Sequence, residues 1–190
     1  MSLYICNDKK RETVDCLISG TTLLLAIHDV GNTTLWVANV GDSRGVMSCG
    51  PEEVIPLSYD HKPSQIKERK RIEEAGGFVA MNGVWRVQGI LATSRAMGDF
   101  PLKNKNVVTS EPDVLSFDTS RLGADFAVLA TDGLWDTHSN EAVASHVRDS
   151  LNKDKQKIGA DQLHEAAKDI ALDSYGRGST DNITVIVVKL

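Results

Sequence analysis

The stretch that decides the fold reads Phe126-Ala127-Val128-Leu129-Ala130-Thr131-Asp132-Gly133-Leu134-Trp135-Asp136. It begins with a continuous apolar run whose length is typical of a buried strand. Gly133 then turns the chain, which leaves the carboxylates of Asp132 and Asp136 just beyond the end of that strand. Charge at the tip of a rigid strand suits the binding of a hard cation. A turn with merely solvated aspartates is the alternative.

Composition narrows the class of protein. The chain has 190 residues, 41% of them hydrophobic and 25% charged, which is typical of one ordinary globular domain. Its net charge of −5 argues against nucleic-acid binding, which requires a basic surface. The sequence shows no apolar run of membrane-spanning length and no signal peptide.

Cysteine usage indicates the compartment. Cys6, Cys16 and Cys49 are odd in number and form no C-x-x-C pair. This favours a reducing, intracellular setting, cytoplasmic or nuclear. A membrane anchor in a preceding segment stays open, and the oligomeric state is not indicated.

Short apolar and β-branched runs separated by turns predict an antiparallel arrangement. The expected strands are 23–27, 33–40, 46–49, 78–81, 84–87, 113–117, 126–130 and 183–188. We expect 113–117 to pair with 126–130, and 183–188, apolar throughout, to be buried on both faces.

Helices are expected at 65–75 after the N-cap Ser64, after Ser139, and after Asp161. Residues 1–18 show no periodicity and read as an irregular N-terminal segment or a vector-derived leader. The coarse map is therefore an α+β layered domain.

Three aspartates occupy comparable positions: Asp42 follows one predicted strand, Asp132 ends another, and Asp181 precedes the last. They converge if these strands are neighbours. Clustered carboxylates repel one another, and a divalent cation with oxygen ligands offsets that repulsion. Such an Mg²⁺ or Mn²⁺ site suits phosphate chemistry, although each aspartate alone is most simply a turn cap.

An ordered set of motifs carries a family resemblance. The main ones are Ser19-Gly20-Thr21-Thr22, Val40-Gly41-Asp42-Ser43-Arg44, Asp60-His61-Lys62-Pro63, Ser94-Arg95-Ala96-Met97-Gly98-Asp99, Ala130-Thr131-Asp132-Gly133 and Asp181-Asn182-Ile183-Thr184-Val185. In this order and spacing the chain resembles the metal-dependent 2C-type Ser/Thr protein phosphatases, and among them the animal 1-like branch. The resemblance runs from about Ser19 to the C-terminus.

The resemblance implies a β-sandwich of two antiparallel sheets flanked by helices in α-β-β-α layers, with two or three Mn²⁺ or Mg²⁺ ions at one end. Asp132 and Asp181 match catalytic metal ligands, and Asp42 and Asp136 match, with Asp132, a further metal position. The expected reaction is hydrolysis of phosphoserine and phosphothreonine in phosphorylated proteins by a metal-activated water, without a covalent intermediate.

Residues 60–106 match the region of the family that contains the flap over the substrate. Arg86, Arg95 and Asp99 lie in it. Their implied role is in the substrate region, and a structural ion-pair network is the alternative.

One family motif is missing. The resemblance implies an Asp-Gly-His-Gly motif, a phosphate-contacting arginine and a glutamate before Ser19, and the chain contains no Asp-Gly-His. We therefore expect 19–190 to be the C-terminal portion of a catalytic domain, with unpaired sheet edges and little activity alone. A non-catalytic pseudophosphatase or regulatory binding module is the alternative.

A serine hydrolase is a separate possibility. Gly41-Asp42-Ser43-Arg44-Gly45 fits the G-x-S-x-G pattern of a nucleophile elbow. That elbow requires a strand, a turn and then a helix, whereas 46–49 is predicted to continue as a strand. The sequence context therefore disfavours this function.

Overall fold

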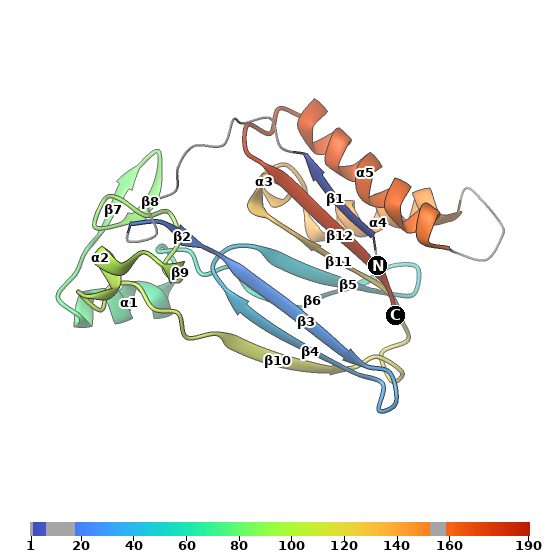
Figure 1. Cartoon of the computed structure of the whole chain (residues 1–190), viewed down its shortest axis with the longest axis horizontal. Helices are drawn as coiled ribbons and strands as arrows, with labels where there is room; N and C mark the ends of the chain where they lie inside the picture. Colours follow the sequence, from blue (N-terminus) through green and yellow to red (C-terminus); the bar gives the residue numbers. More distant parts are fainter. Residues whose placement is uncertain (1, 7–17, 153–158) are drawn as a thin grey trace.

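The computed structural model describes residues 2–6, 18–152 and 159–190 (Figure 1). In this part of the chain the largest sheet is antiparallel and has the order β1-β12-β11-β5-β6. Its strands are Ser2–Cys6 (β1), Ile183–Lys189 (β12), Ala124–Ala130 (β11), Arg44–Cys49 (β5) and Glu53–Pro56 (β6).

A second antiparallel sheet packs against the first. It has the order β10-β4-β3, formed by Asp113–Asp118 (β10), Thr34–Val40 (β4) and Leu23–Asp29 (β3). Two small pairs complete the strands: Gly20–Thr21 (β2) with Met97–Gly98 (β9), and Val79–Asn82 (β7) with Val84–Val87 (β8).

The described helices are Ile66–Glu74 (α1), Phe100–Lys103 (α2), Asp132–Trp135 (α3), Asn140–Asn152 (α4) and Ala160–Gly176 (α5). Helix α5 packs on β12 and β1, and α4 packs on α5, β5 and β6 (Figure 1). Helices α1 and α2 lie with β7 and β8 at one end of the sandwich. The expected α+β fold, with antiparallel sheets flanked by helices, is confirmed.

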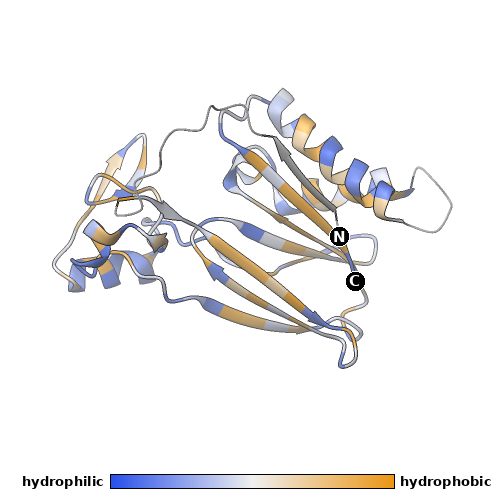
Figure 2. Ribbon diagram, viewed as in Figure 1, coloured by the Kyte–Doolittle hydropathy of each residue, from blue (hydrophilic) through white to orange (hydrophobic). Residues whose placement is uncertain are grey.

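Apolar side chains form the core on both sides of the five-stranded sheet. Val128, Val185 and Ile170 are fully buried between this sheet and the helices α4 and α5. On the opposite face of the sheet, Met47 and Leu129 belong to a second cluster between the two sheets. Strand β12 contributes apolar residues to both faces, but only the face towards the helices is buried, and the other is half-buried, so the predicted burial on both faces holds in part. The hydrophobic colouring of Figure 2 follows the strands of both sheets.

The expected pairing of 113–117 with 126–130 is wrong. Strand β10 pairs with β4 in the smaller sheet, and β11 pairs with β12 and β5 in the larger one. The connection at 119–123 carries the chain from one sheet to the other. The Thr119 amide and hydroxyl both donate to the Thr33 carbonyl at 2.8 Å, which anchors this crossing. Strands consecutive in sequence therefore face each other instead of pairing.

Residues 2–6 were expected to be irregular but form β1, which pairs with β12. The segment Leu3-Tyr4-Ile5 has high strand propensity, and β12 offers it a free edge for backbone hydrogen bonds. The rest of the predicted N-terminal segment, 7–17, lies outside the described residues. Strand β6 and helix α3 were not predicted.

The observed starts of the helices agree in part with the predicted starts. The Ser139 hydroxyl accepts the Ala142 amide at 3.2 Å, as an N-cap should. Helix α1 begins after Gln65 instead of Ser64. Helix α5 begins after Gly159 instead of Asp161, because the Gln162 side chain accepts the Gly159 amide at 2.6 Å.

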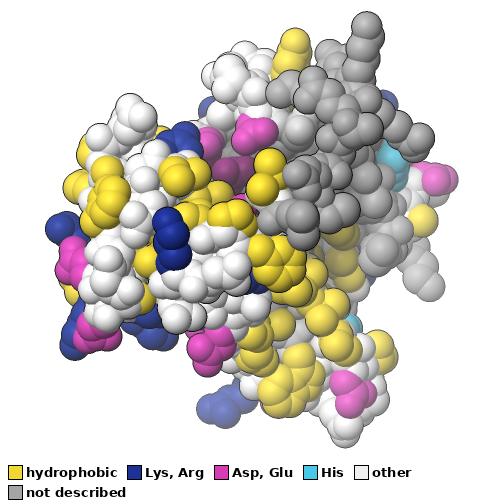
Figure 3. Space-filling model, turned by 60° about the vertical axis from the view of Figure 1, so that its left-hand side comes forward, with side chains coloured by type: hydrophobic (Ala, Val, Ile, Leu, Met, Phe, Trp, Pro, Cys, Tyr) yellow, Lys and Arg dark blue, Asp and Glu magenta, His cyan; other side chains and the backbone are white. Residues whose placement is uncertain are grey.

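The outer face of the three-stranded sheet is apolar and uncovered by helices in the described part of the chain. Leu25, Ile27, Trp36 and Val114 share this face and are 46%, 56%, 50% and 55% exposed. Figure 3 shows exposed hydrophobic side chains beside a hollow in which acidic side chains gather. We call Leu25, Ile27, Trp36 and Val114 the apolar sheet face.

Candidate metal centre

The three predicted aspartates reach one end of the five-stranded sheet because β12, β11 and β5 are antiparallel neighbours. Asp42 lies just before β5, Asp132 just after β11, and Asp181 just before β12. In an antiparallel sheet the start of one strand lies beside the end of its neighbour. Asp136 joins them from the other end of the single turn of α3.

Backbone contacts lock the Asp132 and Asp181 loops together. The Thr131 hydroxyl donates to the Asn182 carbonyl at 3.1 Å and accepts the Thr184 amide at 3.0 Å. A Cβ atom on Gly133 would lie 2.5 Å from the Asn182 carbonyl oxygen, so this approach requires glycine. Asp132 and Asp181 therefore emerge from loops with a fixed spacing.

Asp132 lies among several other negatively charged side chains. Burial and the neighbouring carboxylates of Asp42, Asp181 and Asp136 raise the pKa of Asp132 to about 6. Lys62 opposes this shift. A carboxyl group held among like charges is one that a divalent cation would stabilise in its ionised form.

Lys62 balances part of this negative charge. Its ammonium lies 2.5 Å from the Asp42 carboxylate, which is buried. Burial alone would lower the pKa of Lys62, but the hydrogen bond to Asp42 and the charges of Asp42 and Asp132 raise it. Lys62 is therefore charged and faces the acidic end of the sheet.

Arg44 holds the surrounding elements in place. Its guanidinium donates to both carboxylate oxygens of Asp60 at 2.8 and 2.7 Å, and to Asn140 Oδ1 at 2.9 Å. It also lies 5.2 Å from the centre of the Trp135 ring. These contacts connect β5 to Asp60, to the end of α3 and to the start of α4.

The residues predicted for the flap region are dispersed. Arg95 is buried and bonded to Glu68 at 2.6 Å and to Asp113 at 2.9 Å. Arg86 donates to the Ile90 carbonyl on the exposed β8 turn. Asp99 has a left-handed backbone, φ 51°, and its carboxylate packs over Gly20. For Arg95 this geometry favours the structural ion-pair alternative.

The serine hydrolase alternative loses its support. Residues 41–43 connect β4 to β5, so no helix follows the serine. The Ser43 hydroxyl is 2.8 Å from the Thr22 hydroxyl, and no histidine takes part in that contact.

The donor set fits a hard divalent cation only in part. The carboxylates of Asp42, Asp132, Asp136 and Asp181 are the ligands that Mg²⁺ and Mn²⁺ prefer. Among the described residues, however, no three His, Cys, Asp or Glu side chains already surround a single point. The carboxylates therefore match the ligand preference of these ions, while the described residues supply an incomplete set of metal ligands.

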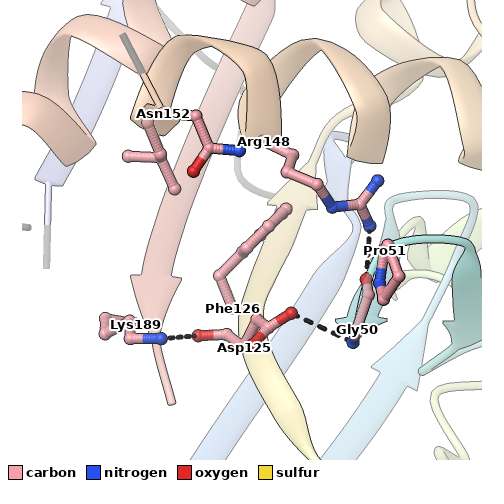
Figure 4. Close-up of a pocket in the computed structure, with 8 residues that line it drawn as sticks. Gly50, Pro51, Asp125, Phe126, Arg148, Asn152 and Lys189 are labelled. Carbon is pink, nitrogen blue, oxygen red and sulfur yellow. Dashed lines mark hydrogen bonds between the residues drawn. The ribbon is translucent and has the colours of Figure 1, made fainter. Parts of the chain in front are cut away.

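A separate cavity of about 290 Å³ lies at the opposite end of the same sheet (Figure 4). There Arg148 donates to the Gly50 carbonyl at 2.9 Å, and the Gly50 amide donates to Asp125 at 3.0 Å. Lys189 donates to the Asp125 backbone carbonyl at 2.8 Å. These contacts hold α4 and the end of β12 against the β5–β6 turn. This turn lies at the end of the sheet opposite to Asp42, Asp132 and Asp181.

The fold and the acidic strand ends identify the class of protein. Residues 3–183 match the family described as Protein phosphatase 2C, and the chain belongs to this family. In the described part of the chain, no helix is long and apolar enough to cross a membrane.

Comparisons with individual relatives support this family assignment. The chain is 54% identical over 171 residues to "Protein phosphatase 1L" of Bos taurus, covering 90% of this chain and 44% of that protein. This supports the predicted 1-like branch. The solved "C.elegans sex determining protein" superposes with a TM-score of 0.78 at 26% identity, covering 90% of this chain and 40% of that one. A Toxoplasma gondii phosphatase gives a TM-score of 0.73 at 30% identity, covering 83% and 48%. The chain thus spans less than half of each of these proteins.

Sequence reasoning assigned no role to Arg44, Asp60, Lys62 or Thr131. Arg44, Asp60 and Lys62 lie in the quoted motifs around Asp42 and Asp60. The presence of both positive and negative side chains in these motifs was the available signal for ion pairs. The role of Thr131 depends on a backbone contact with 182–184, which no local pattern reveals.

Proposed function

We propose that this protein hydrolyses phosphoserine and phosphothreonine in phosphorylated proteins, with Mg²⁺ or Mn²⁺ bound at the carboxylate end of the five-stranded sheet. The observation that carries this proposal is the meeting of Asp132 with Asp42, Asp136 and Asp181 at neighbouring strand ends. Membership of the phosphatase family supports it.

The proposed roles differ among the four carboxylates. Asp132 and Asp181, which match the catalytic metal ligands of the family, would bind the catalytic ions, and Thr131 and Gly133 hold their two loops together. Asp42 and Asp136 would, with Asp132, hold a third ion. When bound, such ions lower the pKa of a water molecule and offset charge on phosphoryl oxygens.

The chain's own residues must then supply charge and rigidity. Asp132 has to lose its proton to bind a cation, and its pKa of about 6 allows this at neutral pH. Lys62 has to leave Asp42 accessible for an ion to bind there. Arg44 is held by Asp60 and Asn140, so it orders the elements around the site.

Cys49, the one cysteine whose side chain the structure describes, does not support a cysteine-based phosphatase mechanism. Cys49 is buried in the sheet, and burial raises the pKa of its thiol, with Glu53 and Asp125 adding to the effect. A nucleophilic cysteine needs a lowered pKa instead. This agrees with hydrolysis without a covalent intermediate.

A second candidate is a non-catalytic pseudophosphatase or binding module. The incomplete set of metal ligands among the described residues favours it for this chain. In the phosphatase proposal, 19–190 is the C-terminal portion of the catalytic domain, and further ligands come from a part corresponding to the preceding half of the longer relatives.

The test compares the 190-residue chain with a chimera that carries, before Ser19, the preceding part of the bovine relative. Hydrolysis of p-nitrophenyl phosphate and a phosphothreonine peptide is measured with Mn²⁺ and with EDTA. We expect little turnover by the chain and Mn²⁺-dependent, EDTA-sensitive, okadaic-acid-resistant turnover by the chimera.

In the chimera, Asp132→Asn should reduce turnover by at least about a hundredfold, because it removes the charge of a direct ligand. Asp29→Asn is the matched control, since Asp29 caps the β3–β4 turn through Gly31 and Asn32. Full activity of Asp132→Asn would refute the ligand role of Asp132, whereas an inactive chimera that still binds Mn²⁺ would favour the non-catalytic alternative.

A further inference from the structure

His61 and Gly41 are connected by two hydrogen bonds of opposite direction. The His61 amide donates to the Gly41 carbonyl at 2.9 Å, and the Gly41 amide donates to His61 Nδ1 at 3.0 Å. We call this pair of hydrogen bonds the latch. It holds both polar groups of the residue that immediately precedes Asp42.

The latch fixes the form of the imidazole. Because Nδ1 accepts the Gly41 amide, it carries no proton, so the proton of the neutral ring is on Nε2. Nε2 lies 3.2 Å from the Asp113 carboxylate, which accepts it. Burial and the positive charge of Arg95 lower the pKa of His61, which keeps the ring neutral at neutral pH.

Gly41 has a backbone conformation that needs support. Its φ is +110°, and a Cβ atom there would collide with Thr22. Only glycine adopts such a conformation readily, and its freedom makes it costly to hold still. The latch supplies that restraint, while Lys62, the next residue after His61, contacts the Asp42 carboxylate.

The other side of His61 is anchored in the 60–106 region. Its carbonyl accepts the Ser94 amide at 2.8 Å, the Ser94 hydroxyl at 2.9 Å and the Thr93 hydroxyl at 3.1 Å. Asp113 is itself held by Arg95 at 2.9 Å. His61 is 3% exposed, so it joins the Asp42 loop to a network whose members Glu68, Ser94 and Arg95 are buried.

We propose that His61 is a positioning residue whose latch with Gly41 sets the orientation of Asp42 and thereby the metal affinity of this end of the sheet. The inference rests on the proposed function, because Asp42 is taken as a metal ligand. It implies that the hydrogen-bonded network of Glu68, Arg95 and Asp113 holds His61 in place.

Two substitutions separate positioning from simple core packing. His61→Leu fills the space but removes the acceptor for the Gly41 amide. His61→Asn places an amide oxygen near the position of Nδ1 and can restore that acceptor. His28→Leu is the matched control, because the half-buried His28 makes one side-chain hydrogen bond, to Thr119 at 3.3 Å, away from this loop.

The experiment titrates the 190-residue chain and its variants with Mn²⁺, followed by electron paramagnetic resonance. Loss of a partner that orients a ligand costs about 10- to 100-fold in metal affinity. We expect His61→Leu to raise the Kd for Mn²⁺ about tenfold, with His61→Asn and His28→Leu staying within about threefold of the unmodified chain. Equal loss in His61→Leu and His61→Asn, or no loss in either, would overturn the inference.

Two further measurements do not depend on metal binding. The ¹⁵N chemical shifts of His61 should report a bare Nδ1 and a protonated Nε2, and the Gly41 amide should exchange slowly with solvent in the unmodified chain and rapidly in His61→Leu. A protonated Nδ1 would overturn the latch even if His61→Leu does not fold. Asp42→Asn separates the two failures: if it leaves the Mn²⁺ Kd unchanged, the metal role of Asp42 fails. If it weakens binding and His61→Leu does not, only the positioning role fails.

Discussion

Gly133 and Asn182 are in direct backbone contact, so close that a Cβ atom on Gly133 would lie 2.5 Å from the Asn182 carbonyl oxygen. The carbonyl of Gly133 is held from the other side by the hydroxyls of Ser174 and Ser179, at 2.8 and 2.7 Å. The spacing of the Asp132 and Asp181 loops is thus set by contacts to backbone atoms.

We predict that Gly133→Ala separates these two loops. The new methyl group would overpack a tight contact and cost about 1–3 kcal/mol of unfolding free energy. Mn²⁺ binding should weaken with it. Urea unfolding and Mn²⁺ titration measure both effects. Gly176→Ala, at the end of α5 with open space around it, is the control and should be neutral or slightly stabilising. Equal stability of the two variants would contradict the prediction.

The raised pKa of Asp132 makes stability depend on pH. Its folded pKa is about 6 against an ordinary value of 3.8, so between these values the folded state binds more protons than the unfolded state. The free energy of unfolding should therefore fall as pH rises through this window.

Asp132→Asn should remove this decrease of the free energy of unfolding with rising pH. At pH 7 in EDTA we expect the variant to be more stable than the unmodified chain by about 1 kcal/mol, allowing for solvent screening of a half-buried group. Near pH 4 the two should be alike. Urea unfolding at both pH values is the measurement, and a variant that is less stable at pH 7 would contradict this electrostatic account.

The same pKa predicts how metal binding varies with pH. A cation can bind Asp132 only after its proton leaves. Below pH 6 the Kd for Mn²⁺ should therefore rise by about tenfold per pH unit for one coupled proton, and it should level off above pH 7. Calorimetric titration in two buffers of different ionisation enthalpy would count the proton. A flat Kd between pH 5 and 7 would exclude Asp132 as a ligand.

Sequence patterns located the acidic site better than they located the strand pairing. Asp42, Asp132 and Asp181 each follow or precede an apolar run next to a turn, and antiparallel neighbours bring such ends together whatever the details of the loops. The pairing of β10 depends on a crossing at 119–123, whose anchor is the contact of Thr119 with the distant Thr33 carbonyl. The predicted pairing of 113–117 with 126–130, which are consecutive strands in the sequence, is therefore wrong.

An ion-pair network was one of the two interpretations of Arg95, but its partners could not be predicted. Arg95 and Glu68 are 27 positions apart, and nothing local marks either as buried. Charged residues usually lie at the surface, so the sequence leaves a role of Arg95 in the substrate region open beside the ion-pair interpretation. Only the packing of α1 against 93–113 shows that Arg95 is enclosed.

We predict that Glu68→Gln destabilises the chain strongly. Burial alone would raise the pKa of Glu68, but hydrogen bonds from Arg95 and Ser94 and the charges of Arg95 and Arg71 lower it to about 2. Removing its charge leaves Arg95 buried with only Asp113 as counter-ion, which should cost about 3 kcal/mol. Glu73→Gln, which breaks the exposed pair with Arg69, is the control and should cost less than about 0.5 kcal/mol.

The pH dependence of that difference is itself a test. A lowered pKa contributes stability that is fully present above the ordinary value of 4.5 and is lost as pH falls toward 2. The gap between Glu68→Gln and the unmodified chain should therefore narrow across this range. A gap that stays constant down to pH 2 would assign the loss to packing instead of charge.

The last prediction concerns the apolar sheet face. Ile27 and Trp36 are directly paired across β3 and β4 and are 56% and 50% exposed. An exposed apolar area of several hundred Å² favours association, and the other edge of β3 has no strand partner among the described residues. We expect the 190-residue chain to bind a hydrophobic dye and to sediment faster as its concentration rises. Ile27→Thr keeps a β-branched residue in the strand while reducing the apolar area, so it should weaken both effects. Val30→Thr is the control, because Val30 is 76% exposed in the turn and lies off this face. A monomer that ignores the dye at all concentrations would show that this face does not drive association.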